Sequence, residues 1–158
     1  MHALKHTFSY VHRLSFILSI EILTKGGDIM NNCENNDSVA MMFRDREHKE
    51  RYFGALKRMS SQDAEHVSFV YLVTFVDAPI NDCFDFANDK IKKDMLTCGW
   101  VTDTSRRVLA LAMNLWNYAN AADVSDIFSC VGDYYAEFMF YAIGIRFGYV
   151  PYLTVVKN

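Results

Sequence analysis

The segment HVSFVYLVTFV at residues 66–76 is apolar on nearly every side and rich in β-branched residues. Periodicity alone does not separate a buried helix from a core strand in such a run, so both structures stay open for residues 67–76. The polar residues before it, with Ser60 or Ser61 as the cap, favour a helix. In either form the segment needs apolar neighbours on all sides. The chain can supply them, because 51% of its 158 residues are hydrophobic.

Amphipathic helices are predicted around this central segment. The stretch FRDREHKERYFGALKRM at 43–59 has apolar residues at helical spacing, with acidic residues in its first turn and Lys57 and Arg58 in its last. TDTSRRVLALAMNLWNYANAA at 102–122 is the clearest helix. We predict an all-α fold, a single compact domain of about five helices over residues 42–158 with a flexible N-terminal extension.

Three further local predictions complete this outline. Pro79 is expected to end the central segment, and residues 80–100 are expected to form short helical turns or an ordered loop. Ser125 is expected to cap a short helical turn that ends near Cys130. A last helix begins at Asp133, and its inward stripe is predicted to be Tyr134, Phe138, Tyr141, Ala142 and Ile145.

The N-terminal segment differs from the rest of the chain. It contains an apolar run at residues 14–23, but Glu21 interrupts this run, which is also shorter than the roughly 20 residues that a membrane-spanning helix needs. We therefore expect no membrane span. Most of the histidines also lie in this segment, which leaves His48 and His66 in the predicted domain.

A start site inside the sequence is our hypothesis for this segment. The residues KGGD at 25–28 can be encoded by a purine-rich sequence of the kind that precedes bacterial start codons, and Met30 follows at a normal start distance. Residues 1–29 would then be a leader that is absent from the native protein. Together with the polar residues that follow, they make residues 1–41 a leader and disordered lead-in.

Charge and cysteine content argue against several classes of function. A net charge of −3 and a pI of about 5.9 argue against a protein that holds nucleic acid by bulk electrostatics. The cysteines at 33, 83, 98 and 130 show no metal-binding or redox spacing. We expect reduced, mostly buried thiols in a cytoplasmic protein, with no metal and no cofactor.

The motif Asp-x-Glu-His occurs twice, at residues 45–48 and 63–66. One interpretation is a metal or acid–base site built from five candidate residues: His48, His66, Asp45, Asp63 and Glu65. The interpretation we favour is simpler, because acidic residues complement the positive end of a helix and both motifs lie where a helix begins. A positive helix end also disfavours a bound cation. His66 is then a hydrogen-bonded core histidine on the face of Phe69 and Val70.

A polar ridge on the helix at 102–122 is the second candidate site. It consists of Arg106, Arg107, Asn114 and Asn117. Such a ridge could contact a partner or the phosphates of a nucleic acid, but asparagine also bonds loop backbone where helices pack. Both interpretations stay open.

Three stretches together resemble a known family. MFRDREHKERYFGALKRM, HVSFVYLV and GWVTDTSRRVLALAMNLWN are similar to domain of unknown function 6075, small helical proteins of Gram-positive bacteria, their phages and mobile elements. The resemblance covers roughly residues 42–147, and its most specific part runs from Gly99 to Asn117. It implies a cytoplasmic location and an accessory role. It supplies no catalytic residues.

The sequence lacks the nucleophile-elbow, phosphate-loop and zinc-protease motifs of common enzymes. We therefore predict a non-enzymatic accessory protein that acts by protein–protein interaction, in one version by inhibiting a host or defence protein. Self-association stays open. The first alternative is a metal-dependent or acid–base enzyme using His48 and His66 with the nearby carboxylates. The weaker one is a nucleic-acid-contacting module that uses the polar ridge.

Overall fold

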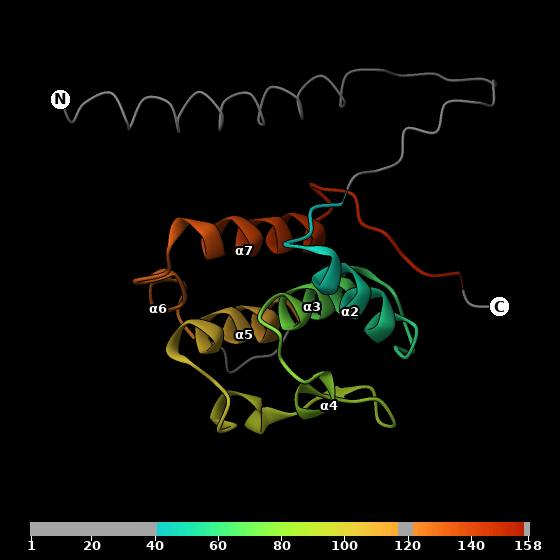
Figure 1. The fold of residues 1–158 in the computed structure, drawn as a ribbon, viewed down its shortest axis with the longest axis horizontal. Coiled ribbons are helices and arrows are strands. Elements are labelled where there is room, and N and C mark those ends of the chain that lie inside the picture. Colours follow the sequence, from blue (N-terminus) through green and yellow to red (C-terminus); the bar gives the residue numbers. More distant parts are fainter. Residues whose placement is uncertain (1–40, 117–121, 157–158) are drawn as a thin grey trace, which may run out of the picture. The chain divides into compact units, whose positions relative to one another are not determined.

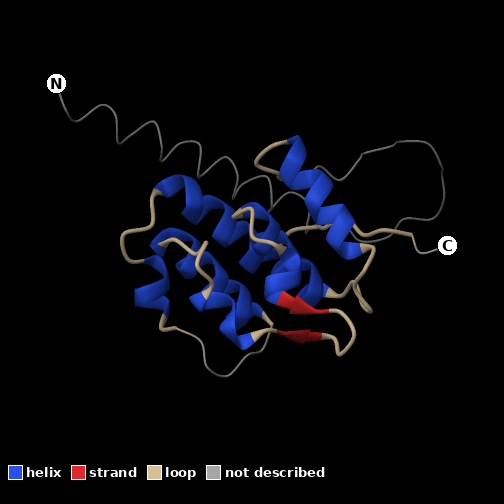
Figure 2. Cartoon of the chain, turned by 60° about the horizontal axis from the view of Figure 1, so that its bottom comes forward, coloured by secondary structure: helices blue, strands red, loops and turns tan. Residues whose placement is uncertain are grey.

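The computed structural model describes residues 41–116 and 122–156, and the predictions made for residues 1–40 and for Asn117 lie outside them. The described chain is mostly helical, which confirms the predicted all-α class (Figures 1 and 2). The elements in order are α2 (Arg46–Leu56), α3 (Ala64–Phe75), α4 (Ile80–Cys83), β1 (Phe84–Asp85), β2 (Lys90–Ile91), the 3-10 helix η1 (Lys93–Thr97), α5 (Asp103–Leu115), α6 (Val124–Phe128) and α7 (Asp133–Arg146).

The apolar run at 66–76 forms helix α3, and this helix is the centre of the domain. Every residue from His66 to Phe75 is buried, and α2, α5 and α7 pack around it. Figure 1 shows α3 between these three helices. The ambiguity between helix and strand is therefore resolved in favour of a helix, because three amphipathic helices supply the apolar surroundings that the segment needs.

The start of α3 corrects the predicted cap. Asp63, rather than Ser60 or Ser61, is the cap, and its carboxylate accepts from the amides of Glu65 and His66. Ser61 donates its hydroxyl to the same carboxylate at 2.8 Å. A carboxylate next to the positive helix end is favoured by its charge as well as by its hydrogen bonds.

Helix α2 begins at the predicted place but ends earlier than predicted. Asp45 caps it by accepting from the amide of His48. The helix ends at Leu56, so Lys57 and Arg58 lie beyond it rather than in its last turn. The backbone forms a tighter turn after Leu56, in which the N–H of Arg58 donates to the carbonyl oxygen of Ala55. No basic side chain lies in the last turn of α2 to compensate the helix dipole.

Helices α5 and α6 start with side-chain caps, whereas α7 follows Gly132 without one. Thr102 and Ser105 form a reciprocal capping box at the start of α5. Asp123, rather than the predicted Ser125, caps α6 and accepts from the amide of Ser125. Helix α7 starts at Asp133 as predicted.

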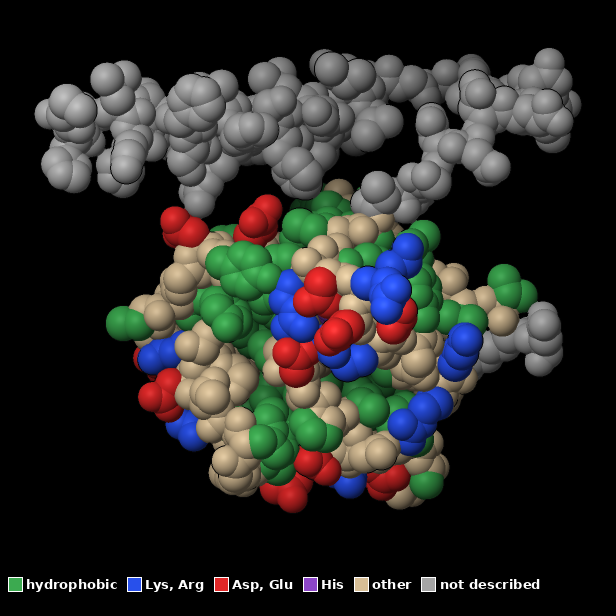
Figure 3. All heavy atoms as spheres, viewed as in Figure 1, with side chains coloured by type: hydrophobic (Ala, Val, Ile, Leu, Met, Phe, Trp, Pro, Cys, Tyr) green, Lys and Arg blue, Asp and Glu red, His purple; other side chains and the backbone are tan. Residues whose placement is uncertain are grey.

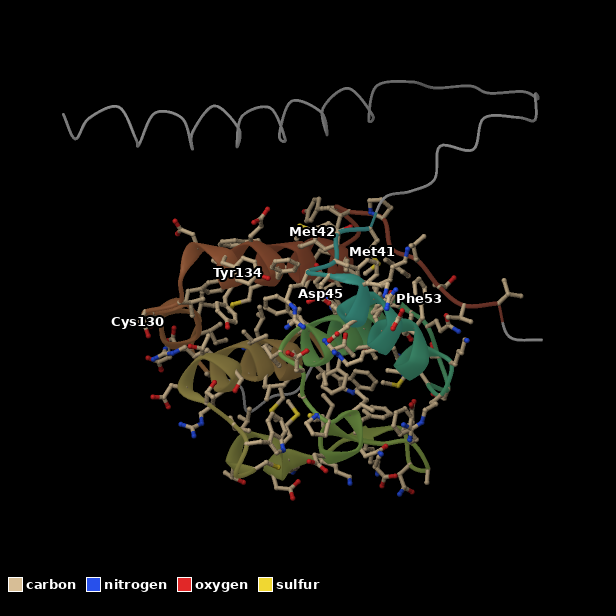
Figure 4. The ribbon with its side chains drawn as sticks, viewed as in Figure 1. Met41, Met42, Asp45, Phe53, Cys130 and Tyr134 are labelled. Atoms are coloured by element: carbon tan, nitrogen blue, oxygen red, sulfur yellow. The ribbon has the colours of Figure 1, made fainter. Side chains whose placement is uncertain are left out.

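The stripe predicted for α7 needs one correction. Phe138, Ala142 and Ile145 are buried, whereas the side chain of Tyr134 is 51% exposed. Tyr134 lies in the first turn of α7, where it contacts Phe75 and Phe138 at the edge of the core (Figure 4).

Residues 79–100 contain a small hairpin that the sequence analysis did not predict. Strands β1 and β2 pair antiparallel, with Phe84 opposite Ile91 (Figure 2). Their buried side chains cover one side of the core. The turn between them holds Asp89 in the left-handed region, with a φ of 52°.

The thiols are less buried than predicted. Cys83 is buried, and this burial raises its pKa to about 12. Cys98 is half-buried and Cys130 is exposed, so a buried environment holds for one of the described cysteines. Cys130 lies in the turn between α6 and α7, where its backbone adopts a left-handed φ of 57°. Of the helices described, none is long and apolar enough to cross a membrane.

Candidate functional site

His48 lies in the core between α2 and α3 and both of its ring nitrogens are occupied. Nδ1 accepts the backbone N–H of Arg44 at 3.1 Å, and Nε2 donates to the carbonyl oxygen of Tyr71 at 3.1 Å. Its ring also packs against Phe43 and Phe75. Burial lowers the pKa of His48 to about 4, so this histidine is neutral at neutral pH.

His66 is held at the start of α3 by two carboxylates. Its Nδ1 lies 2.8 Å from Asp63 and its Nε2 lies 3.2 Å from Asp89 in the hairpin turn. The imidazole contacts the indole of Trp116 edge-on, with the ring centroids 4.3 Å apart. His66 therefore links α3 to the hairpin and to the end of α5, as expected for a hydrogen-bonded core histidine.

The two Asp-x-Glu-His motifs do not form a common site. His48 contacts the middle and end of α3, whereas His66 contacts the hairpin and α5. Among residues 41–116 and 122–156, no side chain bonds both rings. Glu65 accepts from Arg146 at 2.6 Å and so binds α3 to α7. Within the residues that the structure describes, no three His, Cys, Asp or Glu side chains are grouped to hold a metal ion.

The described part of the polar ridge bonds neighbouring loops. Arg107 donates to the carbonyl oxygen of Asp126 and, at 2.5 Å, to the hydroxyl of Ser129. Asn114 donates to the carbonyl oxygen of Ala122 at 3.2 Å. These contacts hold α6 against α5. They match the interpretation in which the ridge bonds loop backbone where helices pack.

Arg106, the third described member of that ridge, has partners as well. Arg106 lies near the start of α5 and contacts Asp103 at 3.3 Å and the carbonyl oxygen of Leu96. Binding of a partner or of phosphate by the ridge stays a prediction.

A charged cluster that the sequence analysis did not identify lies where α3 ends. Asp77 pairs with Arg44 through two bonds of 2.8 and 2.9 Å, and Arg51 donates to the same carboxylate. The hydrogen bond from Arg44 outweighs desolvation and lowers the pKa of Asp77. Asp77 adopts a left-handed φ of 59°. Figure 3 shows acidic and basic side chains gathered in the middle of this face.

A hollow of about 220 Å³ opens beside this cluster. Because Asp77 and Arg44 already bind each other, the hollow offers aromatic surface rather than unpaired charge. Figure 4 shows Tyr134 on the α7 side of this region and Asp45 at the start of α2. The hollow is lined by Arg44, Phe75, Val76, Asp77, Trp100, Thr102, Ser105, Tyr134 and Tyr135.

The outward side of α7 exposes aromatic side chains to solvent. Phe140 is 61% exposed on this helix, and Phe147, just after its end, is 62% exposed. Ala136 and Ile143, which are half-buried, fall between them at helical spacing. We call these four residues the outer stripe. The ring of Phe128 in α6 stacks on Phe140, with centroids 5.1 Å apart, and extends the stripe onto that helix.

The outer stripe could not be separated from the core by sequence alone. Helix α7 is apolar on two opposite sides, and one side, with Phe138 and Ala142, packs on the core. The sequence feature that could have indicated a second apolar side is the spacing of positions 136, 140, 143 and 147, which repeats every three or four residues.

The fold and the surface define a small helical protein with an exposed aromatic helix face. The chain belongs to the family of unknown function DUF6075, whose sequence model matches residues 38–155. This match confirms the family indicated by the resemblance and extends a few residues beyond it at each end. No curated protein and no solved structure matches the chain.

Proposed function

We propose that this protein is a non-enzymatic accessory protein of a bacterium, phage or mobile element, and that it acts in the cytoplasm by binding another protein. The observation that carries this proposal is the outer stripe of α7. Two phenylalanines are more than half exposed on one side of a helix whose opposite side fills the core. Exposed aromatic clusters of this kind are typical of protein interaction sites.

The energetics favour burial of this stripe in a complex. Full burial of a phenylalanine side chain contributes about 1.5–3 kcal/mol, so Phe140 and Phe147 together could provide much of the binding free energy. The α7 backbone is already helical and packed on α3, so little conformational entropy is lost on binding. A rigid, aromatic helix face is therefore well suited to hold a partner.

The contacts of the histidines support the binding function over the enzymatic alternative. A general base needs a nitrogen that can reach a substrate proton, and both nitrogens of His48 bond backbone groups in the core. Both nitrogens of His66 face carboxylates that belong to the domain. These arrangements explain the motifs as parts of the fold. Inhibition of a host or defence protein is the form of binding that the resemblance to proteins of mobile elements favours.

Site-specific photo-cross-linking tests the proposal. A photoreactive phenylalanine analogue replaces Phe140 in the full chain, expressed in its native cell, and a second version carries it at Val156, which is 86% exposed on the C-terminal tail. We expect a discrete protein adduct from position 140 that position 156 does not give. Equal adducts at both positions, or none at position 140, would contradict the proposal.

A further inference from the structure

We propose that the outer stripe of α7 receives a helical segment of the partner that carries apolar side chains flanked by lysine or arginine. This inference rests on the proposed binding function and adds the chemistry of the partner. Two observations carry it. The first is the apolar geometry of the stripe, and the second is the charge of the residues beside it.

The stripe has the shape that fits another helix. Residues 136, 140, 143 and 147 follow one another at steps of four, three and four, which places them along one side of α7. A ridge of this kind packs into the groove of a facing helix. Phe128 stacks on Phe140 with an angle of 16° between the rings, so α6 widens the apolar surface at its middle.

The surface beside the stripe is acidic. Asp133 and Glu137 lie on α7 one step around the helix from the stripe, and both are exposed. Asp126 on α6 and Asp123, which caps that helix, are also exposed, and α6 contributes Phe128. None of these four carboxylates takes part in an ion pair described for the structure.

The basic residues of this region are already engaged. Arg146, the basic residue within 122–146, bonds Glu65 and the carbonyl oxygen of Leu115. Arg107 of α5 bonds the carbonyl oxygen of Asp126 and the hydroxyl of Ser129, and neither of these groups is a carboxylate. Glu65 offsets the charge of Arg146, which lies 5.7 Å from the ring centroid of Phe147, whereas Arg107 keeps its positive charge. The four carboxylates outnumber that one cation, so the net charge beside the stripe is negative and favours a partner segment of positive charge.

The two features act on different properties of binding. Burial of Phe140 and Phe147 supplies affinity that depends little on salt. The carboxylates raise the association rate and discriminate against acidic segments, and salt screens this effect. A partner that is apolar but acidic would bring like charges together at the rim of the site and would be rejected.

Two synthetic probes test this chemistry against the full-length protein. The first is an amphipathic helical peptide with a leucine face flanked by lysines, and the second has the same leucine face with glutamates in place of lysines. We expect the lysine peptide to bind at least about tenfold more tightly in fluorescence anisotropy. Phe140→Ser should weaken its binding by about tenfold or more. The paired change Asp133→Asn with Glu137→Gln should weaken binding and reduce its salt dependence.

Matched variants separate the stripe from general acidity. Asp94→Asn removes an exposed carboxylate from η1, and Val156→Ser removes an exposed apolar residue from the tail. Both should bind the lysine peptide as the wild type does. The inference would be overturned if Asp94→Asn or Val156→Ser weakened binding as much as Phe140→Ser or the paired Asp133 and Glu137 change. Equal affinities for the lysine and glutamate peptides would also overturn it.

A further measurement tests whether the outer stripe binds a different protein or a second copy of this chain. Light scattering measures the mass of the full chain in solution, and we expect a monomer. A dimer that Phe140→Ser dissociates would show that a second copy covers the stripe and would overturn the inference. A partner cross-linked at position 140 that contacts the site through an acidic segment would overturn the inferred chemistry while leaving the binding function intact.

Discussion

The Nε2 atom of His48 lies 3.1 Å from the carbonyl oxygen of Tyr71, one turn before the end of α3. Because Nδ1 of the same ring accepts the N–H of Arg44, the neutral tautomer with its proton on Nε2 satisfies both contacts. A second proton would turn the contact with Arg44 into two facing N–H groups. Helices α2 and α3 are therefore joined by a bond that requires an uncharged imidazole.

This bond predicts a dependence of stability on pH. Burial sets the pKa of His48 to about 4 in the folded protein, against about 6.5 in the unfolded chain. Between these values the unfolded chain binds more protons, so the free energy of unfolding falls as the pH is lowered through this window, by at most about 1.4 kcal/mol per pH unit. Urea unfolding of wild type and His48→Gln at several pH values measures the effect, and the variant should show a shallower slope.

The carboxylate of Asp63 also makes stability depend on pH, but over a lower pH range than His48. Although desolvation opposes it, hydrogen bonding from His66 holds the pKa of Asp63 at about 2. A depressed carboxyl pKa gives stability above its unfolded value of about 3.9, which is lost as the pH falls towards 2. The pH range in which Asp63 affects stability therefore lies below the range in which His48 does. Equal slopes for wild type and His48→Gln between pH 4 and 6.5 would contradict the role given to His48.

Tyr52 and Tyr71 are buried and their rings are in contact, but their hydroxyl groups differ in hydrogen bonding. The hydroxyl of Tyr52 donates to the carbonyl oxygen of Leu153 at 2.7 Å. The hydroxyl of Tyr71, within the described chain, is buried without a hydrogen-bond partner. Tyr52→Phe should lower the free energy of unfolding by about 1 kcal/mol, whereas Tyr71→Phe should leave it unchanged or raise it by up to about 1 kcal/mol. Thermal and urea unfolding measure both. Similar losses in the two variants would show that Tyr71 has a partner, such as a buried water.

Asp77 combines ion pairs with a left-handed backbone, and two substitutions separate these contributions. Asp77→Asn keeps a residue that tolerates a positive φ but removes the charge that binds Arg44 and Arg51. It should cost about 0.5–1 kcal/mol, because the pairs are partly exposed. Asp77→Ala should cost about 1 kcal/mol more, since it adds backbone strain.

Salt provides the control for the Asp77 variants. In about 0.5 M NaCl the difference between wild type and Asp77→Asn should shrink, because salt screens exposed pairs. The difference between Asp77→Asn and Asp77→Ala should stay, because strain does not depend on salt. If the two variants unfold at the same temperature, the backbone at this position is not strained.

The sequence predicts helix starts well because capping is local. Asp45 and Asp63 each bond amides two or three residues ahead, and the repeated motif carries that spacing. The prediction of a serine cap for α3 is wrong because Asp63, two residues after Ser61, has the required chemistry as well. In the structure they act together, with the serine hydroxyl bonding the carboxylate. A choice between adjacent caps depends on where the chain enters the helix, which periodicity does not specify.

Contacts between distant elements could not be predicted. Asp89 reaches His66 from a hairpin that has only two residues in each strand, too short for a period to be visible. Arg44 and Asp77 meet because α2 and α3 pack side by side. The outer stripe of α7 was hidden for a related reason. The helix is apolar on two sides, and only packing determines which side is left in solvent.

Gly144 of α7 lies directly under the C-terminal tail. A β-carbon at this position would come within 3.0 Å of Cγ2 and 3.3 Å of Cγ1 of Val150. Both Tyr149 and Val150 donate their backbone N–H groups to the carbonyl oxygen of Gly144, so the close approach is part of how the tail is held. In an exposed helix Gly→Ala would stabilise by about 1 kcal/mol, but crowding against Val150 should reverse the sign here.

A double-mutant cycle tests whether Val150 causes this reversal. Gly144→Ala alone should lower the free energy of unfolding by about 1 kcal/mol. In the background of Val150→Ala the crowding atoms are gone, and the same substitution should become neutral or stabilising because alanine favours the helix. Urea unfolding of the four proteins gives the coupling free energy. A value near zero would mean that the tail moves aside freely, and the bonds from the tail to Gly144 would then contribute little to the stability of the domain.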